Sequence, residues 1–208
     1  MALTTYAELQ AAVLDRMDRA DLTTPVIDWI TIAEKDICRW PRMSWLEKRA
    51  YATPTEAFIE VPTDFVSLRD IQWNYSNYRV TLEQVSPDLI DKVYSSNSTG
   101  LPCYFCINDN HFELRPAPAT GNETTLEITY FKKPVALSDS NTSNEILVNA
   151  PDALFYRTLS EGFDYIMDES RSAKYMQMYS KIMQEAVADS KRRKWDGVPL
   201  RVMTDSVV

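Results

Sequence analysis

Residues 151–194, PDALFYRTLSEGFDYIMDESRSAKYMQMYSKIMQEAVADSKRRK, decide the fold. They predict two amphipathic helices joined by a tight turn near Glu169–Arg171. Apolar residues recur on one side of the first helix: Phe155, Leu159, Gly162, Phe163 and Ile166. The second helix repeats the pattern in a broader stripe: Tyr175, Met176, Tyr179, Ile182, Met183, Ala186 and Val187. This stripe is wider than the surface that one partner helix covers. We expect most of it to be buried in the core of the chain and part of it to form a contact with another subunit.

A basic run, Lys191–Lys194, ends the second helix, and Gly197 follows it as a stop. The helix dipole favours cations in a last turn. In an acidic chain, such a run at a helix end more often interacts with the helix dipole or contacts another protein than binds nucleic acid. The candidate contacts with other protein chains are Tyr175, Tyr179, Ile182, Met183, Lys191, Arg192, Arg193, Lys194 and, in the arm beyond the helix, Arg201.

The composition is that of a soluble protein with its own core. The chain has 208 residues, 45% of them hydrophobic, and a net charge of −8. A chain of this length buries roughly 70% of its unfolded surface and needs no metal or disulfide staple. The acidic balance argues against broad binding to nucleic acid, whose phosphates attract Lys and Arg. We see no membrane span and no signal peptide, and the odd count of three Cys fits a reducing compartment.

Helices are predicted at both ends of the chain. Thr5 and Glu8 form a capping box for a helix that reaches about Arg19. Thr24 caps a second helix with Pro25 at its first position, and Pro41 ends it. A polar linker, 138–144, precedes the C-terminal pair that begins at about residue 150.

Strands fill the middle of the chain. Short runs at 45–52 and 57–61 come first, and Ile71, Trp73 and Tyr75 then alternate with polar residues. Ser76-Asn77 turns this strand into a return strand at 78–82, and a short helix runs from Pro87 to about Tyr94. A second hairpin pairs 101–107 with 111–115 around residues 108–110, and one more strand covers 126–130.

The order of these elements predicts an α+β fold. We expect an antiparallel helical bundle, built from the N- and C-terminal helices, with an inserted antiparallel β-rich domain. The predicted divisions are N-terminal helices at 1–43, the β-rich domain with one short helix at 44–133, a linker at 134–149, the C-terminal helix pair at 150–195 and an extended arm at 196–208.

The residues do not predict an active site, a cofactor or a metal. Four isolated Gly cannot build a phosphate loop or a dinucleotide fingerprint. Cys103, Cys106 and His111 contain the pieces of a zinc-deaminase signature, but in the wrong chain order. Cysteines three apart on a strand point to opposite faces, so a zinc-dependent hydrolase or deaminase is a distant alternative. Glu161, Asp164 and Asp168 share one side of their helix, and we interpret them as a solvated face rather than a catalytic set.

Several blocks, in their order, resemble one known family. They are TTYAELQAAVLDRMDRADL near the start, VPTDFVSLRDI at 61–71, LEQVSP at 82–87, GLPCYFCINDNHFELRPAP at 100–118, LEITYFKKPVALSDSNTSNEIL at 126–147 and APDALFYRTLSEGFDYIMDE at 150–169. Together they resemble the head-to-tail adaptor, or connector, proteins of short-tailed bacteriophages. Cys103 and Cys106 depart from the strand formers usual at those positions, and the arm beyond 195 is not covered.

The resemblance implies a structural virion protein and no enzyme. Such proteins form a ring, commonly dodecameric, with the portal above and the tail or nozzle proteins below, and DNA passes through the bore. The candidate contacts would then meet neighbouring subunits or the portal. The implied location is the virion neck, with the host cytoplasm during assembly. A tail-tube or nozzle subunit is the alternative within the virion, and a cytoplasmic binding module is the alternative outside it.

Overall fold

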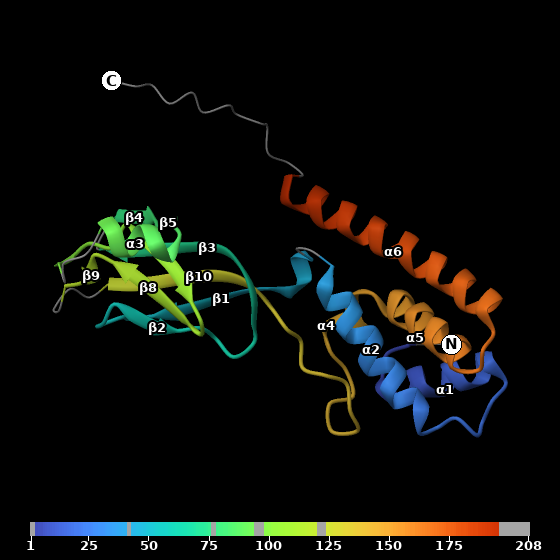
Figure 1. Ribbon diagram of the computed structural model, residues 1–208. Coiled ribbons are helices and arrows are strands. Elements are labelled where there is room, and N and C mark those ends of the chain that lie inside the picture. The colour runs from blue at the N-terminus through green and yellow to red at the C-terminus, as the bar shows by residue number, and fades with distance from the viewer. Residues whose placement is uncertain (1–2, 41–42, 76–77, 94–97, 120–123, 196–208) are drawn as a thin grey trace. The chain divides into compact units, whose positions relative to one another are not determined.

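The computed structural model describes residues 3–40, 43–75, 78–93, 98–119 and 124–195, and the fold is mixed α+β as predicted (Figure 1). The chain forms two units. One contains the chain up to Trp45 and again from Pro134 onward, and the other runs from Leu46 to Lys133. The first is helical and the second is built mainly of strands. The predicted Pro41 helix end, the Ser76-Asn77 turn, the Gly197 stop and the arm at 196–208 lie outside the described residues.

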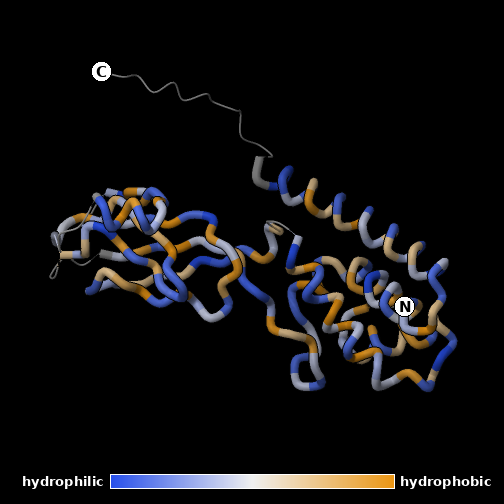
Figure 2. Tube along the Cα trace, viewed as in Figure 1, coloured by the Kyte–Doolittle hydropathy of each residue, from blue (hydrophilic) through white to orange (hydrophobic). Residues whose placement is uncertain are grey.

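The helical unit is arranged around one helix. It contains α1 (Tyr6–Met17), α2 (Pro25–Arg39), α4 (Glu145–Asn149), α5 (Pro151–Tyr165) and α6 (Glu169–Trp195). Helix α5 contacts all four of the others, and α6 is its most extensive partner. In Figure 2, apolar positions recur at intervals along α6 rather than in one continuous run. This is the pattern of a helix that buries one side only.

The N-terminal signals of the first two helices have different outcomes. The predicted capping box of α1 is confirmed: Thr5 Oγ1 accepts from the Glu8 backbone N–H, and Glu8 Oε2 accepts from the Thr5 N–H. The predicted extent to Arg19 is two residues too long, because Asp18 adopts a left-handed conformation, with φ of 55°. Pro25 is the first residue of α2 as predicted, but Thr24 makes no side-chain capping bond because its own backbone is already helical.

The turn between α5 and α6 lies earlier than predicted. It covers Ile166–Asp168, where Met167 has a φ of 61°, and Glu169 already belongs to α6. The Asp168 side chain accepts from the Arg171 backbone N–H at 3.0 Å, which satisfies a donor in the first turn of α6. The predicted turn between the two helices exists, but it lies just before the predicted position near Glu169–Arg171. The predicted linker also contains α4, which the Asn144 side chain caps by accepting from Leu147 N–H.

In its described residues, the second unit contains two four-stranded sheets and a two-stranded pair. The first sheet has the order β1 (Glu47–Ala52), β10 (Thr124–Lys132), β3 (Phe65–Tyr75) and β4 (Tyr78–Thr81), and all its pairs are antiparallel. The second has the order β2 (Phe58–Glu60), β8 (His111–Arg115), β7 (Tyr104–Asn108) and β5 (Glu83–Gln84). The β5–β7 pair is parallel, as is the pair of β6 (Thr99–Gly100) and β9 (Ala117–Pro118), so the unit is not purely antiparallel.

The core of this unit follows the predicted alternation. Ile71 and Trp73 of β3 are buried with Leu126, Ile128 and Tyr130 of β10 and with residues from the second sheet, Phe105, Phe112 and Leu114. Strand β3 begins at Phe65, well before the predicted start at Ile71, and a register shift in its pairing follows Thr129. The run predicted from Trp45 begins as a 3-10 turn, η1 (Ser44–Leu46), and the hairpin strand predicted from Leu101 begins at Tyr104. The short helix is confirmed as α3 (Pro87–Val93).

Candidate functional site

The apolar side of α6 is mostly core of its own chain. Tyr175, Tyr179 and Met183 are 6%, 2% and 0% exposed. The Tyr175 ring stacks on Phe163 of α5 with a centroid distance of 5.3 Å. These three candidate contact residues are therefore buried within their own chain, whereas Ile182 is half-buried at the edge of the stripe. Of the other residues in the predicted stripe, Met176 is exposed, and Ala186 and Val187 are half-buried.

Tyr179 is fixed by polar contacts as well as by packing. Its hydroxyl accepts from Trp40 Nε1 at 2.9 Å, and the Arg157 guanidinium lies 5.9 Å from the centre of its ring. Burial raises the pKa of Tyr179 to about 12. Its phenol is therefore a neutral donor and acceptor inside the helical unit, not a free surface group.

Arg157 is a buried cation that the hydrophobic periodicity did not point to. It is 8% exposed, and its Nε donates to Asp36 of α2 at 2.6 Å. Its Nη1 forms an ion pair with Glu161, one helical turn later, at 2.5 Å. The only sequence signal for this arrangement was the i, i+4 spacing of Arg157 and Glu161, because Asp36 lies on another helix.

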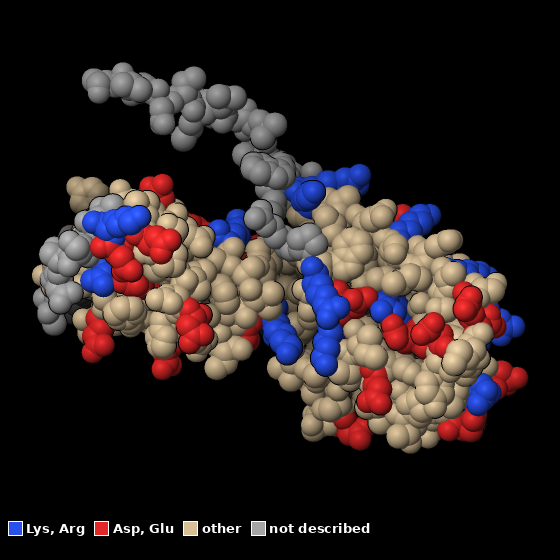
Figure 3. All heavy atoms as spheres, in the orientation of Figure 1, with Lys and Arg blue, Asp and Glu red and all other residues tan. Residues whose placement is uncertain are grey.

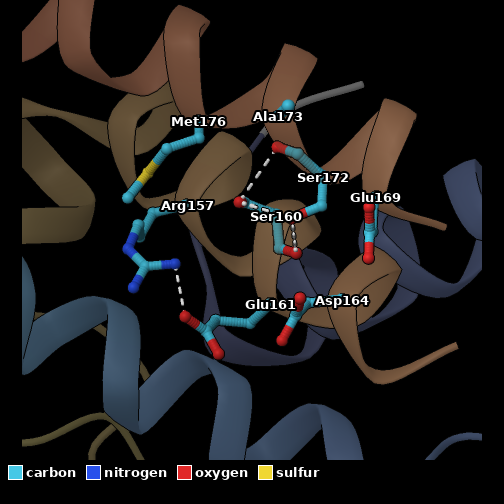
Figure 4. Close-up of a pocket in the computed structure, with 8 residues that line it drawn as sticks. All are labelled: Arg157, Ser160, Glu161, Asp164, Glu169, Ser172, Ala173 and Met176. Atoms are coloured by element: carbon cyan, nitrogen blue, oxygen red, sulfur yellow. Dashed lines mark hydrogen bonds and ion pairs between the residues drawn. The ribbon is translucent and has the colours of Figure 1, made fainter. Parts of the chain in front are cut away.

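A polar pocket of about 350 Å³ opens beside this pair (Figure 4). Glu161 and Asp164 of α5 line it together with Glu169 and Met176 of α6. Its inner wall is a close contact of the two helices, in which the hydroxyls of Ser160 and Ser172 each donate to the other residue's carbonyl oxygen, at 3.1 and 3.0 Å. Asp168, predicted on the same side as Glu161 and Asp164, instead caps α6.

The basic end of α6 is exposed where it is described. Lys191, Arg192 and Arg193 are exposed, and Arg192 forms a long ion pair of 3.5 Å with Asp189. Figure 3 shows Lys and Arg along α6 up to this end, whereas Asp and Glu gather on the face between α2 and α6. The side chain of Lys194 and all of Arg201 lie outside the described residues.

The cysteine cluster does not form a metal site in the described residues. Cys106 is buried on β7 and its thiol donates to Glu113 Oε2 at 3.6 Å, whereas Cys103 is exposed just before the strand. Burial, and then the nearby Glu113 carboxylate, raises the pKa of Cys106 to about 11. Within the described ranges, no three His, Cys, Asp or Glu residues are placed to hold a metal ion.

The family model described as SU10 adaptor protein matches residues 4–203. No curated protein matches the chain. In the part of the chain that the structure describes, no helix has both the length and the apolar character to cross a membrane.

Proposed function

The chain belongs to the SU10 adaptor protein family, a family of phage head-to-tail adaptors, and from this membership we propose that it forms a ring between the portal and the tail or nozzle of a bacteriophage. The observation that carries the proposal is the extent of the family match, 4–203, which includes residues of both structural units. The family is one of structural proteins, and we propose a structural role without catalysis.

In this proposal the helical unit is an antiparallel bundle that carries the inserted β-rich domain. The exposed cations at the end of α6, Lys191, Arg192 and Arg193, together with the arm that contains Arg201, meet the portal or a neighbouring subunit. A ring of twelve copies has closed symmetry and joins each copy to two neighbours through two different faces.

The net charge supports a role in DNA passage rather than DNA binding. Each copy has a net charge of −8, so a ring has an excess of carboxylates. A bore of the same sign as the phosphate backbone repels DNA and lets it pass without being held. We place the ring in the virion neck, after assembly in the host cytoplasm.

Native mass spectrometry of the chain mixed with the portal ring from the same genome tests this function. We expect binding in a fixed multiple, one copy per portal subunit, because closed symmetry requires it. Rings or tubes that form without affinity for the portal would indicate a tail-tube or nozzle subunit instead. A chain that stays monomeric and ignores the portal would contradict the adaptor role.

A further inference from the structure

Helix α6 has two different flanks beside its buried side. At 100° per residue, Met176 and Met178 lie 200° apart, on opposite sides of the buried line of Tyr175, Tyr179 and Met183. The two methionines are 39% and 37% exposed. Each flank therefore presents one half-exposed apolar side chain next to the α5–α6 contact.

The flank that contains Met176 is acidic. It is the pocket shared with Glu161, Asp164 and Glu169, and the labelled carboxylates of Figure 4 lie around its opening. Among the described residues that line the pocket, Arg157 is the only cation, and two carboxylates already hold it. Asp164 and Glu169 are exposed and have no ion-pair partner among the described residues. The pocket therefore has an excess of negative charge and an apolar wall.

The flank that contains Met178 is basic at its Arg171 end, whereas the exposed carboxylate of Glu185 lies seven residues beyond Met178. Arg171, Met178 and Ile182 recur at i, i+7 and i+11, which puts them on one line along α6. Arg171 lies 5.4 Å from the centre of the Phe163 ring and forms a long, exposed ion pair with Asp168, at 3.4 Å. Arg16 of α1 adds a second exposed cation here, since its Nε donates to the Tyr175 hydroxyl at 3.2 Å.

We propose that these two flanks bind each other between neighbouring copies. The basic flank of one copy, with Arg16, Arg171 and Met178, covers the acidic pocket of the next copy, with Asp164, Glu169 and Met176. The occupant of the pocket is thus a second copy of this chain, chosen by opposite charge and by one exposed methionine on each side. A contact between two different patches of identical chains is heterologous, and such contacts close into a ring when the rotation permits. The proposal rests on the proposed ring and names the surface that closes it.

Two charge reversals test this contact. Asp164→Lys puts a cation at the opening of the pocket, and Arg171→Glu puts a carboxylate on the basic flank. We expect each variant alone to associate at least about tenfold more weakly, because like charges then face each other. An equimolar mixture of the two variants should recover association, since alternating copies again meet with opposite charges. Gln177→Glu, at an exposed α6 position that lies 100° from both Met176 and Met178, is the control and should behave as wild type.

Association is measured by sedimentation velocity over a concentration and salt series, and as copy number on the portal ring by native mass spectrometry. Circular dichroism and thermal unfolding confirm that each variant is folded. If Arg171→Glu fails to fold, Arg16→Glu reverses the same flank. The wild-type contact should weaken with salt, as exposed charges require.

The outcomes separate this contact from the proposed function. Reversals that leave both association and copy number unchanged overturn the contact, while wild-type binding to the portal would keep the adaptor role. A mixture that does not recover association also overturns it. A wild-type chain that self-associates through these flanks but does not bind the portal supports the contact and contradicts the adaptor role. A wild-type chain that does neither contradicts both.

Discussion

Arg157 of α5 donates from Nε to Asp36 of α2 at 2.6 Å, across 121 residues of sequence. The same guanidinium pairs with Glu161 through Nη1, so one buried cation is held by two carboxylates from two helices. The guanidinium also lies over the ring of Tyr179, which belongs to α6. Arg157 thus joins α2, α5 and α6 at a single point beside the acidic pocket.

Removing this cation should destabilise the helical unit strongly. In Arg157→Ala, the half-buried carboxylates of Asp36 and Glu161 face each other without their shared partner. We expect a loss of about 3 kcal/mol in the free energy of unfolding, measured by urea denaturation. Arg157→Lys keeps the positive charge but cannot reproduce the planar, two-directional hydrogen bonding of the guanidinium. It should therefore be less stable than wild type but more stable than Arg157→Ala. An alanine variant as stable as wild type would show that the network contributes nothing.

Gly162 lies where Met17 of α1 and Trp29 of α2 approach α5 closely. A Cβ built there would lie 2.6 Å from Met17 Sδ and 3.0 Å from Trp29 Cζ3. Gly162→Ala gains about 1 kcal/mol of helix propensity, but the overlap should outweigh it and give a net loss of about 1–2 kcal/mol. In the Met17→Ala background the cost should shrink, because the clashing sulfur is gone. The measurement is a double-mutant cycle by urea denaturation, and equal costs in both backgrounds would contradict the clash.

Sequence periodicity identified the buried side of α5 and α6 but not the polar groups inside it. Leu159, Gly162 and Phe163 are buried as the stripe predicted. Arg157 and Ser160 are buried too, because their partners lie on α2 and α6, and no local pattern encodes such distant contacts. The predicted α5–α6 turn lies too late in the sequence because polar residues continue from the turn into the first turn of α6. The start of α6 is fixed by one hydrogen bond, from the Arg171 N–H to the Asp168 side chain, and the composition does not reveal that bond.

In the second unit, the strand interiors were predictable and their ends were not. Ile71 and Trp73 alternate with polar residues, and that pattern alone placed them in the core. The register shift after Thr129 breaks the pairing near the start of β3, and alternation carries no information about a partner strand. Helix α4 has five residues, too few for a helical period to be seen.

Glu34 gives the helical unit a pH dependence of definite sign. This buried carboxylate accepts from the Leu137 backbone N–H at 3.2 Å and from Asn144 Nδ2, which fixes the segment before α4 onto α2. Burial raises the pKa of Glu34, despite these hydrogen bonds. The folded state then binds the proton more tightly than the unfolded state does, so this group costs stability as pH rises from its unfolded pKa through its folded pKa.

Glu34→Gln should remove that cost and keep the acceptor for Leu137. The stability of wild type relative to Glu34→Gln should therefore fall as pH rises through this window and stay level above it. Urea denaturation of both proteins from pH 4 to pH 8 measures the difference. Glu34→Ala is the contrasting variant: it removes the acceptor of two buried donors and should be about 2 kcal/mol less stable than Glu34→Gln at every pH. A wild-type advantage over Glu34→Gln that grows with pH would refute the assigned shift.

Tyr130 and Asp64 give the second unit the opposite pH dependence. The buried Tyr130 hydroxyl donates to Asp64 Oδ1 at 2.6 Å, and Lys48 Nζ reaches Oδ2 at 2.7 Å. Burial works to raise the pKa of Asp64, but the hydrogen bonds from Lys48 and Tyr130 outweigh it and the pKa is lowered. The stabilisation is therefore present above the unfolded pKa of an Asp and is lost as pH falls through the lower folded pKa.

Tyr130→Phe should cost about 2 kcal/mol at neutral pH, the value of a hydrogen bond to a charged group. The gap to wild type should narrow as pH falls below the ordinary pKa of Asp, because the acceptor is then protonated. Lys48→Met tests the exposed partner and should cost less at every pH, since solvent screens that pair. Denaturation curves at pH 3 and pH 7 measure these differences. A gap for Tyr130→Phe that is wider at pH 3 would be inconsistent with this bond.

Tyr179 and Ile182 separate folding from assembly on one helix. Tyr179 is 2% exposed and accepts a hydrogen bond from Trp40. Tyr179→Asp therefore puts a charge into the core and should lower the free energy of unfolding of the helical unit by several kcal/mol. Ile182 is half-buried on the basic flank, so Ile182→Asp should keep the fold with a modest loss and weaken association of copies. Thermal unfolding and sedimentation velocity, run on both variants, measure the two effects separately. An Ile182→Asp chain that associates like wild type would exclude this flank from the contact, while an equally stable Tyr179→Asp chain would contradict the buried position of Tyr179.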